Sequence, residues 1–391
     1  MTTNFDEPIE RRNTHSDKWD NMERVYGISA DEGIAMWVAD MDFRSPQSIS
    51  DAMQELVDGS IYTYYGDQRS YLDAICNWMD RRHGWKVDPS WILSVNGVNN
   101  GAAMAVQAYT KENDGVILFT PVYHSFATML RANNRRIVES EMVNNNGRYE
   151  MDLDALEAQL QGDEKLLIFC SPHNPGGRVW SVEELQAVAA FCVKHDLILV
   201  SDEIHHDLVY QGHKHTIMSL AAPDIQDRLL IMCATTKTFN IAGAHIGNVI
   251  ISDDALREKY VRVMRAGKIS VNRFGYHMAE AAYNGGEEWL DDWLEYMLEN
   301  KRIFDEGINA IPGLKSMNMQ ATYLAWVDFS GTGMTRDEFT ERVIKVAEVA
   351  PNQGKAFGKG GENFLRFNIA TRRELVSEAV KRIAAAFADL Q

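Results

Sequence analysis

Six short runs built almost entirely of apolar residues constrain the fold of this chain more than any other feature. They are W-I-L-S-V at 91–95, G-V-I-L-F at 115–119, L-L-I-F-C at 166–170, L-I-L-V at 197–200, L-L-I-M-C at 229–233 and N-V-I-I-S at 248–252. Strands that are apolar throughout are typical of a parallel sheet covered by helices on both faces. The residues between the runs have helical periodicity; 182–195, for example, places Leu185, Val188, Ala189 and Cys192 on one face. The pattern predicts an α/β fold with a mostly parallel sheet.

The alternation of apolar runs and helical segments ends near residue 285. Residues 286–310 are charged and rich in Trp, and they predict a long helix that leaves the sheet. Residues 323–329 and 364–370 alternate, which predicts a small antiparallel sheet with one exposed face. Single hydrophobic cores stop growing near about 250–300 residues, and this chain has 391. We therefore expect a large domain at 47–285 and a smaller α+β domain formed by 1–46 and 286–391.

Composition excludes several classes of partner. The formal net charge is −17, and Lys and Arg are scattered, so nucleic acid and anionic membrane surfaces are not expected partners. No apolar run approaches the about 18 residues of a membrane span, and the N-terminus lacks the apolar segment of a secretory signal. The four cysteines show no C-x-x-C spacing, which indicates reduced thiols. The sequence predicts a cytoplasmic enzyme.

Lys237 is the strongest candidate for a catalytic residue. It lies in A-T-T-K-T-F-N-I-A-G at 234–243, directly after the apolar run at 229–233. Burial near a cationic group keeps a lysine amine neutral, and the neutral amine forms Schiff bases. A single lysine of this kind is otherwise a surface residue in a turn, so its neighbours in the predicted fold decide between the two interpretations.

Asp202 supplies the second part of the argument. It follows the run I-L-V, at the carboxyl end of a predicted strand, where open parallel sheets place their ligands. A carboxylate there can pair with a protonated pyridine nitrogen and make the ring an electron acceptor. By itself Asp202 also fits a helix cap. Together, Lys237 and Asp202 predict pyridoxal 5'-phosphate (PLP) as the cofactor.

Three further segments carry candidate cofactor-binding residues. Asn174 lies in the turn H-N-P-G-G, where its amide can hold the ring hydroxyl and the substrate carboxylate, although asparagine is common in turns. Gly97, Val98 and Asn99 lie where a strand gives way to a helix, so their amides can bind a phosphate; an ordinary glycine turn explains them equally well. Tyr123 follows another strand and can stack on an aromatic ring or pack in the core.

Arg366 is the candidate for substrate binding, because a guanidinium flanked by aromatics in F-L-R-F-N-I-A matches a carboxylate.

Histidines at 205–206 and 213–215 suggest metal ligands. No carboxylate or cysteine spacing completes a metal site around them, so we interpret them as loop or surface histidines and predict no metal.

Several blocks of the chain resemble those of a known group. They are W-V-A-D-M-D-F (37–43), R-R-H-G-W (81–85), S-P-H-N-P-G-G-R-V-W (171–180), S-D-E-I-H (201–205), K-T-F-N-I-A-G (237–243) and T-Y-L-A-W-V-D (322–328). The set resembles the MalY/PatB group of cystathionine β-lyases, within the class I/II aminotransferase superfamily of fold-type I PLP enzymes. This resemblance implies a seven-stranded, mostly parallel sheet between helices, plus a smaller α+β domain.

The resemblance also implies a role for each motif residue. Lys237 holds the cofactor in a Schiff base, and Asp202 pairs with the pyridine nitrogen. Asn174 contacts the ring hydroxyl and Tyr123 stacks on the ring. Arg366 binds the α-carboxylate of the substrate.

Further positions are implied around the cofactor. Thr236 stands where the group often has a phosphate-binding serine, and His205 lies near the ring. A tyrosine from the neighbouring subunit commonly completes the phosphate site. From its spacing, Tyr62 is the candidate for this tyrosine, and Tyr64 is the alternative. Since the tyrosine comes from a second subunit, the resemblance implies a homodimer with shared active sites.

The chain departs from the family pattern at two places. It reads N-I-A-T-R-R where N-I-A-C-P-R is usual, which alters Thr371 and Arg372 near the substrate side. Many aminotransferases have a phosphate-binding arginine eight positions after the lysine, and here that position is His245. Phosphate binding is then expected to depend more on backbone amides and hydroxyls.

The implied reaction is a carbon–sulfur β-elimination on cystathionine or a related cysteine S-conjugate, which yields a thiol, pyruvate and ammonia. The alternative is an aminotransferase, which uses the same lysine, aspartate and arginine. A third possibility is a regulatory protein that keeps PLP and binds a partner; the intact set of cofactor residues argues against a purely non-catalytic protein.

Overall fold

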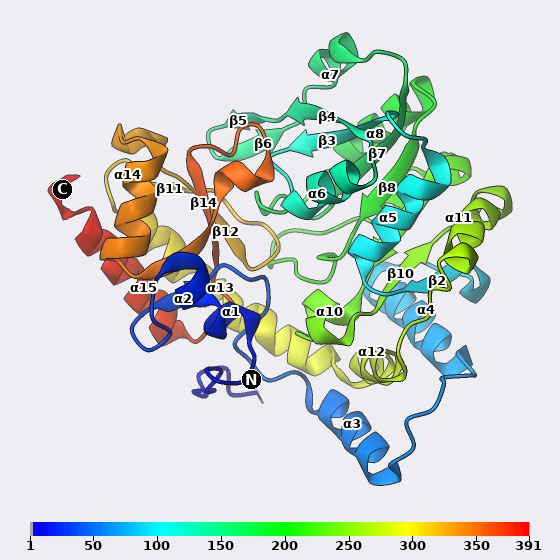
Figure 1. The fold of residues 1–391 in the computed structure, drawn as a ribbon, viewed down its shortest axis with the longest axis horizontal. Helices are drawn as coiled ribbons and strands as arrows, with labels where there is room; N and C mark the ends of the chain where they lie inside the picture. The colour runs from blue at the N-terminus through cyan, green and yellow to red at the C-terminus, as the bar shows by residue number, and fades with distance from the viewer. Residues whose placement is uncertain (1–2, 391) are drawn as a thin grey trace.

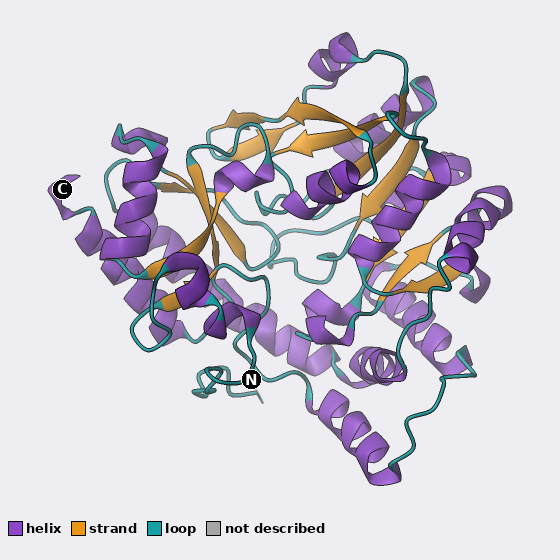
Figure 2. Cartoon of the chain, viewed as in Figure 1, coloured by secondary structure: helices purple, strands orange, loops and turns teal. Residues whose placement is uncertain are grey.

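Two β-sheets, of seven and five strands, and a separate two-stranded sheet make up the strands of the computed structural model, which describes residues 3–390 (Figures 1 and 2). The strands are β1 (Ile34–Met36), β2 (Ile92–Val95), β3 (Gly115–Thr120), β4 (Arg136–Glu141), β5 (Val143–Asn145), β6 (Arg148–Glu150), β7 (Glu164–Cys170), β8 (Ile198–Asp202), β9 (Leu229–Cys233), β10 (Gly247–Ile250), β11 (Lys315–Ser316), β12 (Leu324–Asp328), β13 (Val349–Gln353) and β14 (Phe364–Asn368).

The α-helices connect and cover these strands. They are α1 (Asp17–Asp20), α2 (Met22–Tyr26), α3 (Gln47–Gly59), α4 (Arg69–His83), α5 (Val98–Tyr109), α6 (His124–Ala132), α7 (Leu153–Gln159), α8 (Val182–Lys194), α9 (Met218–Ala221), α10 (Thr235–Thr238), α11 (Asp254–Ala266), α12 (Arg273–Gly285), α13 (Glu287–Asn309), α14 (Arg336–Glu341) and α15 (Arg373–Ala386).

The larger sheet has the strand order β2-β10-β9-β8-β7-β3-β4. Neighbours from β9 to β4 pair in parallel, and β10 is antiparallel to both of its neighbours. The expected α/β fold with a seven-stranded, mostly parallel sheet is therefore confirmed. The six apolar runs coincide with six of its strands. The seventh, β4, lies at the edge and reads R-I-V-E-S-E, in which only two residues are apolar, so it has no continuous apolar run.

Helices cover both faces of this sheet because successive side chains of a buried strand point to opposite sides. In β7, Leu166 and Ile168 belong to the core shared with α5, α6 and α11. The alternate residues Leu167 and Phe169 belong to the core shared with α4, α8 and α12. This two-sided burial explains why the strands are apolar throughout.

The smaller sheet has the order β1-β13-β14-β12-β11 and differs from the sequence-based expectation in two respects. It is mixed, because β1 from the N-terminal segment pairs in parallel with β13. Its central strands are also buried on both faces. Trp326 of β12 donates to the Tyr149 hydroxyl at 2.9 Å on one side, while Phe367 of β14 packs against Phe304 of α13 on the other.

The predicted long helix at 286–310 is α13, which runs from the end of α12 to the small sheet and packs against α15 (Figure 1). The proposed domain division, 47–285 against 1–46 with 286–391, stays a prediction. Within residues 3–390 no helix has both the length and the apolar character needed to cross a membrane.

The N-terminal segment is anchored by a buried charge network. Lys18 is 0% exposed, and its Nζ lies 2.7 Å from Asp42 Oδ2. Arg11 also contacts Asp42, at 2.7 Å, and pairs with Asp40 at 2.8 Å. Burial by itself would raise the pKa of Asp42, but the charges of Lys18 and Arg11 outweigh that effect and lower the pKa. The network fixes the loop that carries residues 37–43.

Replacement Asp42→Asn should lower the free energy of unfolding by about 3–5 kcal/mol, because it leaves Lys18 buried without its closest counter-charge. Glu7→Gln is the matched control, since the Glu7–Arg44 pair is 42% and 67% exposed and such pairs contribute about 0–1 kcal/mol. Denaturant unfolding at fixed protein and PLP concentrations measures both. Equal effects of the two replacements would contradict the assigned role of the network.

Candidate active site

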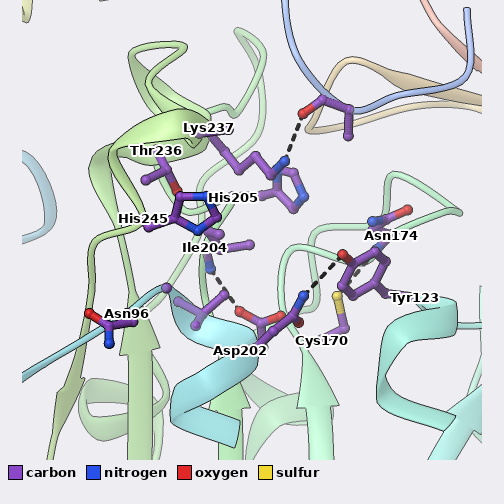
Figure 3. Close-up of a pocket in the computed structure, with 15 residues that line it drawn as sticks. Asn96, Tyr123, Cys170, Asn174, Asp202, Ile204, His205, Thr236, Lys237 and His245 are labelled. Atoms are coloured by element: carbon purple, nitrogen blue, oxygen red, sulfur yellow. Dashed lines mark hydrogen bonds between the residues drawn. The ribbon is translucent and has the colours of Figure 1, made fainter. Parts of the chain in front are cut away.

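The carboxyl ends of the parallel strands open into one cavity of about 190 Å³. Its lining includes every predicted cofactor-binding residue except Tyr62; these are Gly97, Val98, Asn99, Tyr123, Asn174, Asp202, His205, Thr236 and Lys237. Figure 3 shows the labelled side chains, among them Tyr123, Asn174, Asp202 and Lys237, converging from the loops after the strands. The tertiary structure thus brings together residues that lie far apart in the sequence.

Lys237 lies on the short helix α10, directly after β9. Its Nζ donates a hydrogen bond of 2.7 Å to the Ala39 carbonyl, the dashed line near the top of Figure 3. The pKa of Lys237 is lowered to about 8, mainly by burial. Asp40 and Asp202 oppose this lowering, and the charge of Arg366 adds to it. A substantial fraction of the amine is therefore neutral near physiological pH, and the neutral form is the nucleophile.

Asp202 ends β8 and is buried. Its Oδ1 accepts a hydrogen bond of 3.2 Å from the Ile204 amide, so the turn after the strand holds the carboxyl group in place. Burial raises the pKa of Asp202 to about 7. A carboxyl group in this state is stabilised as an anion when a cationic group lies beside it, and a protonated ring nitrogen is such a group.

Arg366 does not line the cavity but lies directly behind it, on β14 of the smaller sheet. It is buried, and it donates to Asn174 Oδ1 at 3.2 Å and to the Trp37 carbonyl at 2.9 Å, and also to Asn352 Oδ1. Its Nε has no hydrogen-bond partner, and none of the ion pairs among residues 3–390 includes it. Burial lowers the pKa of Arg366 to about 10. A buried guanidinium without a carboxylate is suited to bind one from a ligand.

The other end of the cavity is built to receive an anion. Gly97 precedes α5 with φ of 85°, a conformation that side-chain-bearing residues rarely adopt. The twelve-residue helix begins at Val98, so the amides of its first turn point out of the helix and favour negative charge. Thr236 and His245 line the same cavity. His245, eight positions after Lys237, therefore reaches the cavity, and its part in phosphate binding stays a prediction.

Tyr123 and Asn174 lie on the far side of the cavity from α10 (Figure 3). The Tyr123 hydroxyl accepts a hydrogen bond of 3.2 Å from Asn99 Nδ2, which ties it to the anion end. The backbone N–H of Asn174 donates to Cys170 Sγ at 3.4 Å, and the side-chain oxygen of Asn174 accepts a hydrogen bond from Arg366. Asn174 therefore joins the cavity to the guanidinium.

His205 is buried beside Lys237, and its Nδ1 lacks a hydrogen-bond partner. Burial, followed by the charges of Lys237 and Arg366, lowers the pKa of His205 to about 3, so its imidazole is neutral. A neutral ring at this place can contact a bound aromatic group or accept a hydrogen bond from it.

Sequence reasoning missed several residues that line the cavity, and Ala39 is the one that contacts Lys237 directly. Its carbonyl accepts hydrogen bonds from Lys237 Nζ and, at 3.0 Å, from the Tyr323 hydroxyl. Asn368 holds the same loop by donating to the carbonyls of Val38 and Asp40. A backbone carbonyl has no signature in the sequence, and the block 37–43 marked this loop only as a family resemblance.

Tyr62 and Tyr64 lie outside the cavity, in the connection between α3 and α4. They are 56% and 97% exposed, and the Tyr62 ring lies 5.7 Å from that of Phe274. Their role at a neighbouring phosphate site stays a prediction, as do the roles assigned to the other site residues.

The arrangement fits PLP at three of its chemical groups, the aldehyde, the ring nitrogen and the phosphate. A lysine with a lowered pKa stands where an aldehyde reacts, a buried carboxyl can face a ring nitrogen, and a helix N-terminus can receive a phosphate. Arg366 lies behind this set, buried and hydrogen-bonded to Asn174.

Known proteins match this chain over almost all of its length. Residues 33–383 match the family model described as aminotransferase class I and II. Cystathionine beta-lyase PatB of Bacillus subtilis (strain 168) is 38% identical over 386 residues, which cover 98% of this chain and 99% of that protein.

Two crystal structures show the same fold with PLP. Cystalysin from Treponema denticola, which contains PLP, has a TM-score of 0.95 at 33% identity and covers 100% of both chains. The PLP-bound C-S lyase from Staphylococcus hominis has a TM-score of 0.90 at 30% identity and covers 99% of this chain and 98% of its own. These matches confirm the resemblance that the motifs indicated: the chain belongs to the aminotransferase class I and II family and has the fold of its PLP enzymes.

Proposed function

We propose that this chain is a PLP-dependent carbon–sulfur β-lyase that cleaves cystathionine or related cysteine S-conjugates. With water, the products are a thiol, pyruvate and ammonia. The chain is a PLP-dependent enzyme of the cystathionine β-lyase or C–S lyase type. Its substrates and the role of each site residue are proposed here. The observation that carries it is a single buried cavity in which Lys237, Asp202 and the anion end at α5 lie together, with Arg366 behind them.

PLP supplies an electron-withdrawing ring that makes the α-proton of an amino acid acidic. Lys237 would hold the cofactor through its Nζ, and Asp202 would keep the ring nitrogen protonated. Tyr123, Asn174 and His205 would contact the ring. Val98 and Asn99, with Gly97 before them, would hold the phosphate through backbone amides, and Thr236 would add a hydroxyl.

The protein side chains then bind the amino acid and move its protons. Arg366 and Asn174 would hold the α-carboxylate, since the Arg366 guanidinium has donor capacity to spare and Asn174 links it to the cavity. Lys237 Nζ would accept the proton from the substrate α-carbon once the substrate amine has taken its place. Loss of that proton allows a thiolate at Cβ to leave, which completes the β-elimination.

The relatives favour this reaction over the alternative. PatB is named a cystathionine β-lyase, and the Staphylococcus hominis protein a C–S lyase. An aminotransferase would use the same Lys237, Asp202 and Arg366 but return the proton to the cofactor and release a 2-oxo acid. The family description covers aminotransferases, so the assay must separate the two reactions.

The proposal also includes a cytoplasmic homodimer. Ile61, Tyr62 and Tyr64 form an exposed apolar and aromatic run between α3 and α4, at 65%, 56% and 97% exposure. We propose that this run lies against a second copy of the chain and that Tyr62 donates to the phosphate bound there.

L-cystathionine incubated with the purified, PLP-loaded protein should release pyruvate and free thiol in equal amounts. Lys237→Ala should reduce the rate by at least about 1,000-fold, because general base catalysis alone contributes about 10²–10⁴-fold and the covalent anchor is lost too. Pyruvate, thiol and cofactor absorbance are followed together. Conversion of the cofactor to pyridoxamine phosphate without pyruvate would make the chain an aminotransferase.

The amine of Lys237 should become reactive at lower pH than an ordinary lysine. In cofactor-free protein, its acylation rate should rise with pH, reach half its maximum near pH 8 and then level off, because burial disfavours the charged form. Peptide mass spectrometry after brief acylation measures the rate, and Lys381, which is highly exposed, serves as the internal reference for the reagent. A midpoint near the usual pKa of about 10.4 would contradict this.

Tyr62→Phe should weaken PLP binding by about 10–100-fold, the expected loss of one hydrogen bond to a charged group. Tyr64→Phe, in the same connection, is the matched control and should leave the dissociation constant unchanged. Titration of cofactor-free protein with PLP measures both, and sedimentation gives the oligomeric state. A monomer that binds PLP with full affinity would end the dimer proposal, and a loss in Tyr64→Phe alone would transfer the role to Tyr64.

A further inference from the structure

Two imidazoles and a carboxylate form a second cluster, outside the cavity that contains Lys237. His83 is the last residue of α4, and His206 and Asp207 follow β8. One ligand atom from each of the three lies within 4.8 Å of the others. The sequence showed the pair of histidines at 205–206 but no carboxylate or cysteine spacing to complete a site. The fold supplies the missing residue by bringing His83 to them from 124 positions away.

The orientation of His206 is the observation that points to a ligand. Its Nδ1 lies 2.5 Å from the Glu203 carbonyl oxygen, which only accepts hydrogen bonds, so Nδ1 carries the hydrogen. In the neutral ring Nε2 therefore has a free lone pair. This nitrogen is buried, has no hydrogen-bond partner, and lies 3.3 Å from Asp207 Oδ2. A lone pair and a carboxylate oxygen at that distance repel each other unless a cation lies beside both.

The carboxylate of Asp207 is held in place from behind. Trp78 Nε1 donates to its Oδ1 at 3.0 Å, and Thr238 Oγ1 donates to its Oδ2 at 2.8 Å. His83 Nε2 lies 2.8 Å from Oδ1. Metal-binding groups in proteins are oriented in this way, with an imidazole N–H donated to a backbone carbonyl and further hydrogen bonds to the ligating carboxylate.

The cluster opens onto a surface cavity that provides an entry path and room for water. His213 and Lys214 line this cavity together with Arg81 and Arg82. Glu287 pairs with both of these arginines, at 3.0 Å and 3.4 Å, and Asp291 pairs with Arg82 at 2.9 Å, so two carboxylates compensate the two positive charges. Behind His206, Glu203 adds a buried carboxylate that His215 contacts at 2.7 Å.

We propose that His83 Nε2, His206 Nε2 and a carboxylate oxygen of Asp207 bind a divalent transition-metal ion of the Zn²⁺ type, with water from the cavity as a further ligand. Two imidazoles and a carboxylate are ligands that Zn²⁺ prefers, at about 2.0–2.2 Å. Such an ion requires its ligand atoms to be about 3.3 Å apart. His83, whose side chain is the most exposed of the three at 8%, moves inward and exchanges its hydrogen bond to Asp207 for a bond to the metal.

The ion would have a structural role. None of its three ligands lines the cavity of Lys237. It would instead join the end of α4 to the turn after β8, and through Asp207 and Thr238 to α10, the helix that carries Lys237. The competing occupant is a proton on His206 Nε2, which would make a hydrogen bond to Asp207 and leave no room for a metal.

Calorimetric titration of the full-length, PLP-loaded protein with Zn²⁺, after chelator treatment and removal of free PLP, tests the site. Wild type should bind one ion per chain. His206→Ala and His83→Gln should bind at least about 100-fold more weakly, since even groups that only orient ligands contribute about 10–100-fold. Gln at position 83 keeps an N–H donor for Asp207 and replaces the imidazole nitrogen with a carboxamide oxygen, which is a much weaker ligand for Zn²⁺. His213→Ala changes another histidine of the cavity and should bind as wild type does.

Two further measurements keep the test decisive. Zn²⁺ should raise the thermal unfolding midpoint of wild type and His213→Ala but not of His83→Gln, and Co²⁺ should give visible absorption bands that His83→Gln abolishes. If His206→Ala fails to fold, His83→Gln decides alone. Unchanged Zn²⁺ affinity in His83→Gln, loss of binding in His213→Ala, or no binding by wild type would each overturn the proposal, the last in favour of a proton on His206.

Discussion

The burial of Lys237 and Arg366 at the junction of the two sheets is the constraint on which the rest of the site depends. Both are cations by default, and burial lowers the pKa of each, to about 8 and about 10. Neither can be placed in a closed interior without cost, so the protein leaves a cavity next to them. That cavity has a buried carboxyl, Asp202, and a helix N-terminus at its ends. A lysine amine that is partly neutral, a buried carboxyl and a helix N-terminus are chemically complementary to the aldehyde, ring nitrogen and phosphate of PLP.

The N-terminal segment completes the site without contributing a conventional motif side chain. Lys18, Arg11 and Asp42 form a buried network that anchors the loop at 37–43. From this loop the Ala39 carbonyl accepts the hydrogen bond of Lys237, and the Trp37 carbonyl accepts one from Arg366. The loop at 37–43 comes directly after β1, which pairs with β13 in the small sheet. The position of the loop therefore depends on that pairing as well as on the charge network. Stability of the N-terminal segment and positioning of the lysine are aspects of one structural unit.

The sequence predicted the strands of the large sheet well, because burial on both faces makes them apolar throughout. It missed β4, whose position at the edge admits charged residues, and it predicted the wrong environment for β12 and β14. Their alternation suggested one exposed face, but polar groups such as Arg366 are buried there by hydrogen bonds to Asn174 and to the Trp37 carbonyl. Alternation of polar and apolar residues shows which side chains are polar. A polar side chain is exposed only where the fold provides no hydrogen-bond partner for it in the interior.

The sequence by itself determined the fold class, the order of the strands along the chain and the residue types at their ends, since these follow from local periodicity and from the placement of Lys237, Asp202 and Gly97. The tertiary structure alone decided which distant groups meet. Ala39 reaches Lys237, and His83 reaches His206, through contacts between elements more than a hundred residues apart. A backbone carbonyl or an isolated histidine carries no sequence signal for such a contact, because its meaning depends on packing of whole elements rather than on neighbours in the chain.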